Sequence, residues 1–275
     1  MNIFAIIAFL FSIFFAVSPA SSQDPSACTV VGSQTSFPTG TDCWGEPDFY
    51  QIRIYEVGLC TSPPTAPTTS SRPGLSSCTA IFTSATGSVV DVTPTTSSAL
   101  SGVFTRPANG SYLTGYIRMD SSFDIRASLD FGEPITGDAG GNGQFCATID
   151  GSISGGTSAT CANVAPTTGT LQTPLTNFGD VAFEASASAT STTSRGTSTI
   201  DGFLMTGADL LATDEPSVTR LFGVQTFGVP VTIADTTTGV DISFRVTTGM
   251  TLIGNAGPTL SIDSGPFIIE ITPIP

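Results

Sequence analysis

Residues 123–131 read Phe-Asp-Ile-Arg-Ala-Ser-Leu-Asp-Phe, so apolar and polar side chains alternate along the whole stretch. Successive side chains of a β-strand point to opposite faces of its sheet. The alternation therefore predicts a half-buried strand with its apolar face on a core. Residues 240–246 repeat the pattern. Near the end, residues 260–262 and 267–271 predict the two last strands, joined by a turn at Asp263-Ser264-Gly265-Pro266.

Two local features refine the N-terminal half. Apolar residues occupy even positions over 50–54 and odd positions over 55–59, which predicts a β-bulge near Ile54 or a strand buried on both faces. Asn109-Gly110 is a strong turn dipeptide, and Tyr112 follows it directly. We expect the Tyr112 hydroxyl to bond to nearby backbone and to fix this corner, as tyrosines do in many β-sandwiches.

Short strand patterns separated by Gly, Pro, Ser and Thr fill the chain, and no window shows sustained helical periodicity. The sequence predicts an all-β fold, a disulfide-stapled β-sandwich with essentially no long helices, either one large sandwich or two sequential ones. We place a seam at the connector 166–174, giving a disulfide-bearing β domain over 23–163 and a cysteine-free β domain over 164–275. A long crossover within one large sandwich is the alternative.

Two low-complexity stretches interrupt the strand patterns. Residues 61–73 are rich in Pro, Ser and Thr and lie between two cysteines, which predicts an extended, stapled surface loop. Residues 186–199 are nearly all Ser, Thr and Ala, which predicts a polar edge strand or a flexible loop.

The N-terminus carries an uncharged apolar run over 3–17, followed by small residues at Ser18, Ala20, Ser21 and Ser22. This pattern predicts a secretory signal peptide over 1–22, with cleavage after Ala20 or Ser22. A retained N-terminal anchor is the alternative. We therefore expect a secreted protein, extracellular or at the cell surface, with periplasmic residence also open, and no membrane span after cleavage.

Six cysteines in an exported chain predict three disulfides, because oxidising compartments favour pairing. Several connectivities are possible, and the spacings favour sequential pairs. These pairs are Cys28 with Cys43, Cys60 with Cys78, and Cys146 with Cys161.

The charge balance excludes several classes of function. Twenty-two acidic residues stand against eight arginines, with no lysine and no histidine, and the formal net charge is −14. Such a polyanion repels phosphates, which excludes nucleic acid as a partner. Catalysis by histidine, zinc sites with histidine ligands and lysine Schiff-base chemistry are excluded by composition. We interpret the acidity as promoting solubility, with binding of divalent cations as the alternative.

Two short segments contain candidate ligand-binding residues. The only tryptophan, Trp44, lies beside Glu46 and Asp48, and an exposed Trp with carboxylates could stack on a sugar and bond its hydroxyls. The favoured interpretation is that Trp44 packs over the Cys43 disulfide. Asp138 and Asn142, separated by glycines, resemble half of a calcium loop but lack its full pattern, and a simple turn explains them equally well.

These observations favour a non-enzymatic exported protein with a structural or adhesive role at the cell surface or outside the cell. We expect it to bind further copies of itself or other surface proteins through β-strand edges. Glycans are a further candidate partner. The alternative is a carbohydrate- or calcium-dependent ligand-binding β-sandwich module. The third hypothesis is a hydrolase that uses paired carboxylates. No cofactor is expected, calcium being the one candidate.

Overall fold

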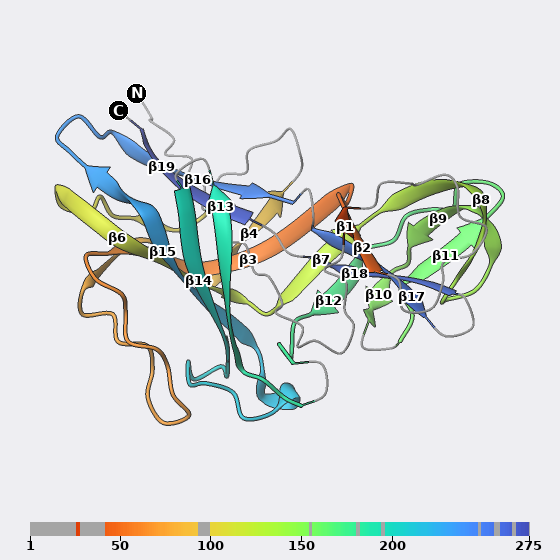
Figure 1. The fold of residues 1–275 in the computed structure, drawn as a ribbon, viewed down its shortest axis with the longest axis horizontal. Helices are drawn as coiled ribbons and strands as arrows, with labels where there is room; N and C mark the ends of the chain where they lie inside the picture. Colours follow the sequence, from red (N-terminus) through yellow and green to blue (C-terminus); the bar gives the residue numbers. More distant parts are fainter. Residues whose placement is uncertain are drawn as a thin grey trace.

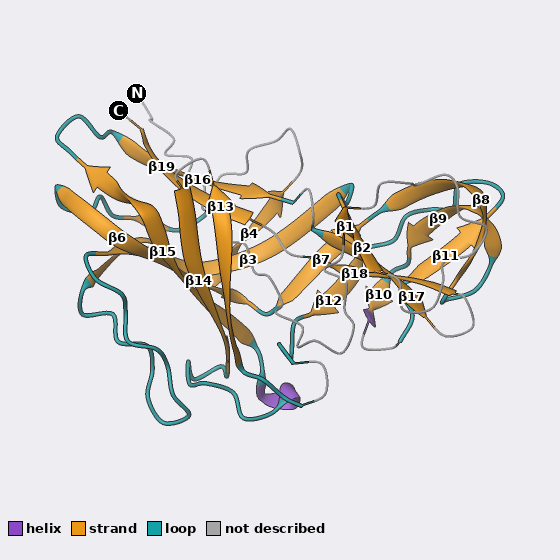
Figure 2. Ribbon diagram, in the orientation of Figure 1, coloured by secondary structure: helices purple, strands orange, loops and turns teal. Residues whose placement is uncertain are grey.

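The computed structural model describes residues 26–27, 42–92, 100–153, 156–179, 182–193, 196–246, 249–255, 259–265 and 268–274. The predicted signal peptide over 1–22 lies outside them. Within the described part the protein is all-β, as predicted (Figure 2). Its short 3-10 helix η2 (Glu215–Ser217) is capped by Asp214, whose carboxylate accepts from Ser217 N.

The larger sheet has ten strands: β3, β4, β6, β13, β14 and β15 lie in the left lobe in Figure 1, and β7, β12 and β10 extend from it toward the right lobe. Its order is β10-β12-β7-β3-β6-β15-β14-β13, with β4 paired to β3 and β5 paired to β4. The strands are β3 (Phe49–Cys60), β4 (Cys78–Val92), β5 (Val103–Phe104), β6 (Gly110–Asp120), β7 (Ser122–Arg126), β10 (Gly151–Ser152), β12 (Leu171–Pro174), β13 (Ser186–Thr193), β14 (Gly196–Met205) and β15 (Arg220–Ile233).

A seven-stranded sheet forms the right lobe, in the order β1-β2-β17-β18-β8-β9-β11, and β16 pairs with β19 in a separate ribbon (Figure 1). Apolar residues of both lobes belong to one continuous core cluster, so the sheets share a core. The strands are β1 (Ser26–Ala27), β2 (Asp42–Gly45), β8 (Ser128–Gly137), β9 (Asn142–Thr148), β11 (Ala159–Ala162), β16 (Gly239–Arg245), β17 (Met250–Asn255), β18 (Thr259–Ser264) and β19 (Ile268–Ile274).

Strand pairing crosses the seam that we expected after residue 163. In the ten-stranded sheet β15 pairs with β6 and β12 with β7, and in the seven-stranded sheet β17 pairs with β2 and β18 with β8. A cut at 163 would remove hydrogen-bonded neighbours from both sheets. The division into 23–163 and 164–275 is therefore corrected: the lobes are built from both halves of the chain, and the crossover alternative accounts for the pairing.

The alternating stretch 123–131 has the faces that we predicted, because Phe123, Ile125, Ala127 and Phe131 are all buried. It is not one strand, however. The chain leaves the ten-stranded sheet at the end of β7 and enters the seven-stranded sheet with β8. The two last strands behave similarly: β18 pairs with β17 and β8, whereas β19 pairs with β16. The chain thus passes from one sheet to another between β18 and β19.

The predicted irregularity near Ile54 is confirmed. The register of β3 against both β4 and β6 shifts between Ile54 and Glu56, and residues 57–60 are buried on both faces. Gly58 is required there, because a Cβ at this position would lie 2.2 Å from Cε1 of Tyr116. The bulge thus lets β3 change faces while it stays paired on both sides.

Two of the three predicted disulfides are confirmed, Cys60–Cys78 and Cys146–Cys161. Cys43 is also disulfide-bonded, and its predicted partner Cys28 lies outside the described residues. The first disulfide closes the surface loop 61–77, which is mostly exposed, as predicted. An antiparallel bridge between Thr65 and Gly74 folds this loop back on itself.

The predicted tyrosine corner is confirmed, since the Tyr112 hydroxyl donates to the Ala108 carbonyl at 2.8 Å while the side chain is buried. Tyr112→Phe keeps the packing but leaves that carbonyl without this donor, so we expect a loss of about 1 kcal/mol in the free energy of unfolding. Urea denaturation measures it. Tyr112→Ala is the control, with a larger loss of about 3 kcal/mol because the ring is removed as well. An unchanged urea midpoint for Tyr112→Phe would show that the corner bond contributes nothing.

Candidate functional site

The segment around Trp44 is built into the sheet. Trp44 lies on β2 between Ala27 of β1 and Thr251 of β17, and its side chain is partly buried. Asp48 accepts from Ser128, at 2.7 Å from its backbone N and at 2.6 Å from its Oγ. Asp48 therefore fixes the start of β8, while Glu46 is exposed. The role of Trp44, Glu46 and Asp48 in binding a glycan stays a prediction.

Asp138 follows β8 directly, and protein donors surround its carboxylate. Oδ1 accepts from Ala159 N at 2.7 Å and from Ser158 N at 2.9 Å, while Oδ2 accepts from the hydroxyls of Ser158 at 2.9 Å and Ser261 at 2.8 Å. Asp138 thus joins the end of β8 to the start of β11 and to the middle of β18. Because these donors occupy both oxygens, a cation would have to displace them.

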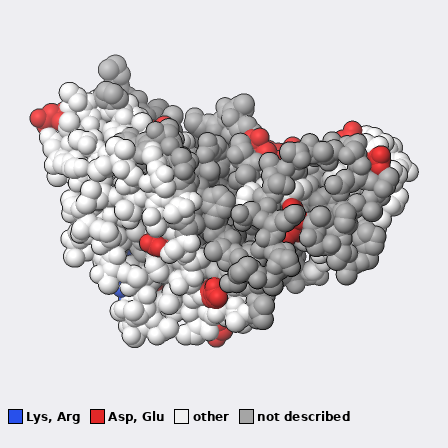
Figure 3. Space-filling view, in the orientation of Figure 1, with Lys and Arg blue, Asp and Glu red and all other residues white. Residues whose placement is uncertain are grey.

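Asn142, the second candidate calcium ligand, donates from Nδ2 to Thr136 Oγ1 at 3.0 Å across its own hairpin. Within the described part of the chain, no group of three or more acidic, Cys or His residues could hold a metal. The hydrogen bonds of Asp138 and Asn142 are compatible with a turn between strands, and calcium stays a prediction. Acidic groups that are visible on the described surface in Figure 3 are scattered singly.

A network of polar side chains that the sequence did not reveal lies on the outer face of the ten-stranded sheet. The Tyr116 hydroxyl donates to Glu56 Oε1, and Arg118 Nη1 lies 3.2 Å from Glu56 Oε2 and 3.6 Å from Asp209 Oδ2. Burial, and then the hydrogen bond to Glu56, raise the pKa of Tyr116 well above its usual range. Asp209 adopts a left-handed φ of 63°, which Asp tolerates better than most residues. The network fixes the turn at Asp209 onto the sheet.

A second cluster continues along the same face. Tyr55 Oη donates to Asp120 Oδ1 at 2.7 Å, Arg53 Nε lies 3.2 Å from Asp120 Oδ2, and the Arg220 guanidinium stacks 3.9 Å from the centre of the Tyr55 ring. These arginines are thus engaged with neighbouring side chains of the same sheet. The face stabilises the packing of strands that lie far apart in sequence.

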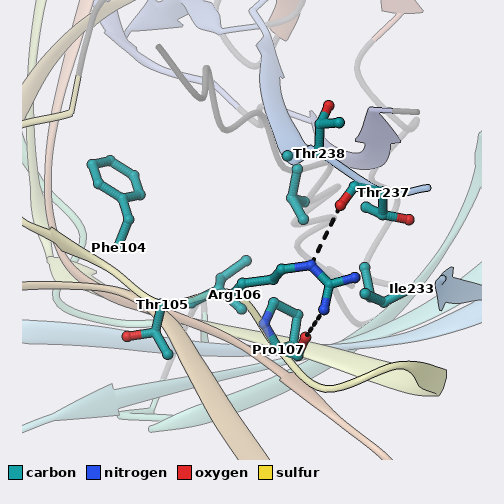
Figure 4. A pocket seen from close by; sticks show the side chains of 10 residues that line it. Phe104, Thr105, Arg106, Pro107, Ile233, Thr237 and Thr238 are labelled. Atoms are coloured by element: carbon teal, nitrogen blue, oxygen red, sulfur yellow. Dashed lines mark hydrogen bonds between the residues drawn. The ribbon is translucent and has the colours of Figure 1, made fainter. Parts of the chain in front are cut away.

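A small pocket of about 160 Å³ lies beside Arg106 (Figure 4). The guanidinium donates to the carbonyls of Thr237, Pro107 and Ala234 and to Asn109 Oδ1. Arg106 therefore ties two turns together instead of reaching toward a ligand. Pockets that bury a drug-sized ligand are about 300 to 1,000 Å³. The remaining lining residues are Ile81, Phe104, Thr105, Ile233, Thr238, Gly239 and Val240.

Among the described carboxyl groups, Asp263 on β18 has the pKa that is shifted most clearly from its usual value. Burial raises its pKa to about 6, although hydrogen bonds from Ser264 act in the opposite direction. The negative charge of Asp263 in turn raises the pKa of Tyr50 on β3, after the larger effect of burial. Asp263 is therefore an acidic group at the place where the two sheets meet.

Strand β13 forms one end of the ten-stranded sheet and pairs, among the described residues, with β14 alone (Figure 1). Its sequence is Ser-Ala-Ser-Ala-Thr-Ser-Thr-Thr, with no charge and no proline. This confirms the predicted polar edge strand over its first part, while residues 196–199 begin β14. Natural proteins usually protect an edge with charges, proline, bulges or shortness. An eight-residue uncharged edge is a template for another strand.

No known protein family, curated protein or solved structure matches this chain. Among the described residues, no helix is long and apolar enough to cross a membrane.

Proposed function

We propose that this chain is an exported, non-enzymatic structural or adhesive protein of the cell surface or extracellular space, which joins other proteins by strand addition at β13. The observation that carries the proposal is the length and composition of the β13 edge. Backbone N–H and C=O groups along such an edge provide affinity for an extended partner.

The other sheet ends are less suited to this role. β1, β5 and β10 have two residues each, and β11 has four. The ribbon strands are longer, but β16 contains Asp241 and Arg245, and β19 contains Pro273. Charge and proline both oppose the addition of a further strand. β13 is thus better suited to a partner than any of these edges.

The extracellular location is supported by two independent features. The predicted signal peptide directs export, and two disulfides staple the described sheets. Disulfides persist in oxidising compartments and are rare in the cytosol. Together these features favour a protein that works outside the cell.

The test compares the full-length protein with Thr190→Pro, expressed in the native host. We expect the processed wild-type protein in extracellular or surface-bound material of high mass, and the variant mainly as free protein. Ser188→Thr is the control, because it adds neither charge nor proline to the edge, and should behave as wild type. Unprocessed protein in the cytosol would overturn the location. Equal retention of Thr190→Pro would overturn strand addition at β13.

A further inference from the structure

We propose that the strand added at β13 is β13 of a second copy, antiparallel and related by a two-fold axis at Ala189, so that Ser188 of one copy lies opposite Thr190 of the other. This inference rests on the proposed function, because it takes β13 to be the site of strand addition. It adds the identity of the partner and the register.

The first step is the direction of the backbone groups. Leu204 N donates to Ala185 O at 2.7 Å, so residue 185 turns its polar groups toward β14. The register pairs Ala187 with Gly202 and Ala189 with Ile200, which continues this alignment. Because N–H and C=O of one residue point to the same side and alternate along an antiparallel strand, the even-numbered residues point to the free edge. These are Ser186, Ser188, Thr190 and Thr192.

The second step is symmetry. Two copies of one edge pair antiparallel around a two-fold axis perpendicular to the sheet, and this axis keeps each side chain on the same face. Hydrogen-bonded partners must then both be even-numbered residues. An axis at Ala189 pairs Ser186 with Thr192 and Ser188 with Thr190, so all four outward residues are bonded in both copies. The side chains of Ser188 and Thr190 are both exposed, and Ser–Thr pairs across strands are favourable.

The third step is charge. With a formal net charge of −14, two copies repel each other, so a contact between them requires a surface with little charge. No charged residue occurs over 186–193. Glu184 lies five positions from Ala189, so the two Glu184 residues would stand at opposite ends of the contact, about 34 Å apart. This separation exceeds the Debye length of about 8 Å at physiological salt. A nearer carboxylate, Asp201 on β14, accepts from Ser188 Oγ within its own copy and lies one strand away from the contact. The uncharged strand β13 itself therefore suits a second copy of this acidic chain.

Cysteine cross-linking of the mature protein tests the register. Ser188→Cys and Thr190→Cys are purified separately, and none of the described native cysteines is free to compete. After mild oxidation, we expect a covalent dimer mainly in the mixture of the two variants, because residues 188 and 190 are directly opposite. Either variant alone should cross-link poorly, since equal positions are diagonal neighbours about 7 to 8 Å apart, beyond disulfide reach. A dimer of Thr190→Cys alone, without one in the mixture, would overturn the register.

Light scattering over a concentration series tests the partner. Wild type should approach dimer mass, and Thr190→Pro should stay monomeric with an unchanged circular-dichroism spectrum, because the N–H it removes points away from β14. Ala189→Pro removes a backbone hydrogen bond to β14 and should destabilise the fold instead. This variant tests the assignment of odd-numbered residues to β14 and of even-numbered residues to the free edge. Monomeric wild type would overturn self-pairing. In that case, release of Thr190→Pro from extracellular material would still support strand addition to another protein, and equal retention would refute both proposals.

Discussion

Asp138→Ala is expected to lower the free energy of unfolding by about 4 kcal/mol, the largest single effect that we predict. The carboxylate accepts from Ser158, Ala159 and Ser261, and both Ser158 and Ala159 are fully buried. Removing it leaves four donor groups on these three residues without their acceptor, and a hydrogen bond to a charged group contributes about 1.5 to 3 kcal/mol. Urea denaturation at neutral pH measures the loss.

Asp150→Ala is the matched control for this measurement. Asp150 is exposed and accepts one bond, from Thr170 N at 2.7 Å, so its removal should cost about 1 kcal/mol. If the two variants lost equal stability, the Asp138 network would contribute no more than a single surface bond. Calcium provides a second check. We expect the wild-type melting temperature to be the same with calcium and with chelator, and a rise with calcium that is lost in Asp138→Ala would show that Asp138 binds a cation.

The role of Asp138 could not be predicted from the sequence, because its partners lie elsewhere in the chain. Ser158 is 20 residues away and Ser261 is 123 residues away. A run of Asp, Gly and Asn gives the same local pattern for a calcium loop and for a turn, so the neighbouring strands decide between them. The disulfides were easier to predict. Cys60 and Cys78 face each other across adjacent strands, as do Cys146 and Cys161, and both pairs are close in sequence.

The strands themselves were predictable, whereas their partners were not. Alternation over 123–131 depends on which side chains face the core, and it continues through Ala127 because both sheets face the same core. The alternation of apolar and polar residues therefore does not show where the chain passes from one sheet to the other. The seam after residue 163 failed for a related reason. All cysteines precede that position, but hydrogen bonding between β6 and β15 is non-local and leaves no trace in composition.

The β13 edge was partly predictable. Ser, Thr and Ala over 186–193 indicated a polar edge strand, yet alternating Ser and Ala give too weak a contrast to say which backbone groups face outward. That information comes from the pairing with β14, through the bond from Leu204 N to Ala185 O. Once the outward-facing residues are known, the effect of each proline substitution follows. Thr190→Pro removes an N–H that points to the free edge, whereas Ala189→Pro breaks a hydrogen bond within the sheet.

Stability is expected to fall by about 2 kcal/mol as the pH rises from about 4 to 7 because of Asp263 alone. Its pKa is about 6 in the folded protein and near 3.8 in the unfolded chain. Between these values the unfolded state has released a proton that the folded state still binds, so rising pH favours unfolding. Above pH 6 the folded protein carries the charge at a costly position. The full shift corresponds to about 3 kcal/mol, reduced here because the side chain is partly exposed.

Asp263→Asn isolates this contribution from the other acidic residues. The amide oxygen can still accept from Ser264 N, and no charge forms at any pH. We therefore expect the stability difference between variant and wild type to shift in favour of the variant by about 2 kcal/mol between pH 4 and pH 7. Urea unfolding at several pH values gives this difference directly. The nearby Tyr50→Phe variant should retain the dependence, because burial is the main cause of the Asp263 shift. A difference independent of pH would mean that Asp263 titrates normally and that water reaches it where the sheets meet.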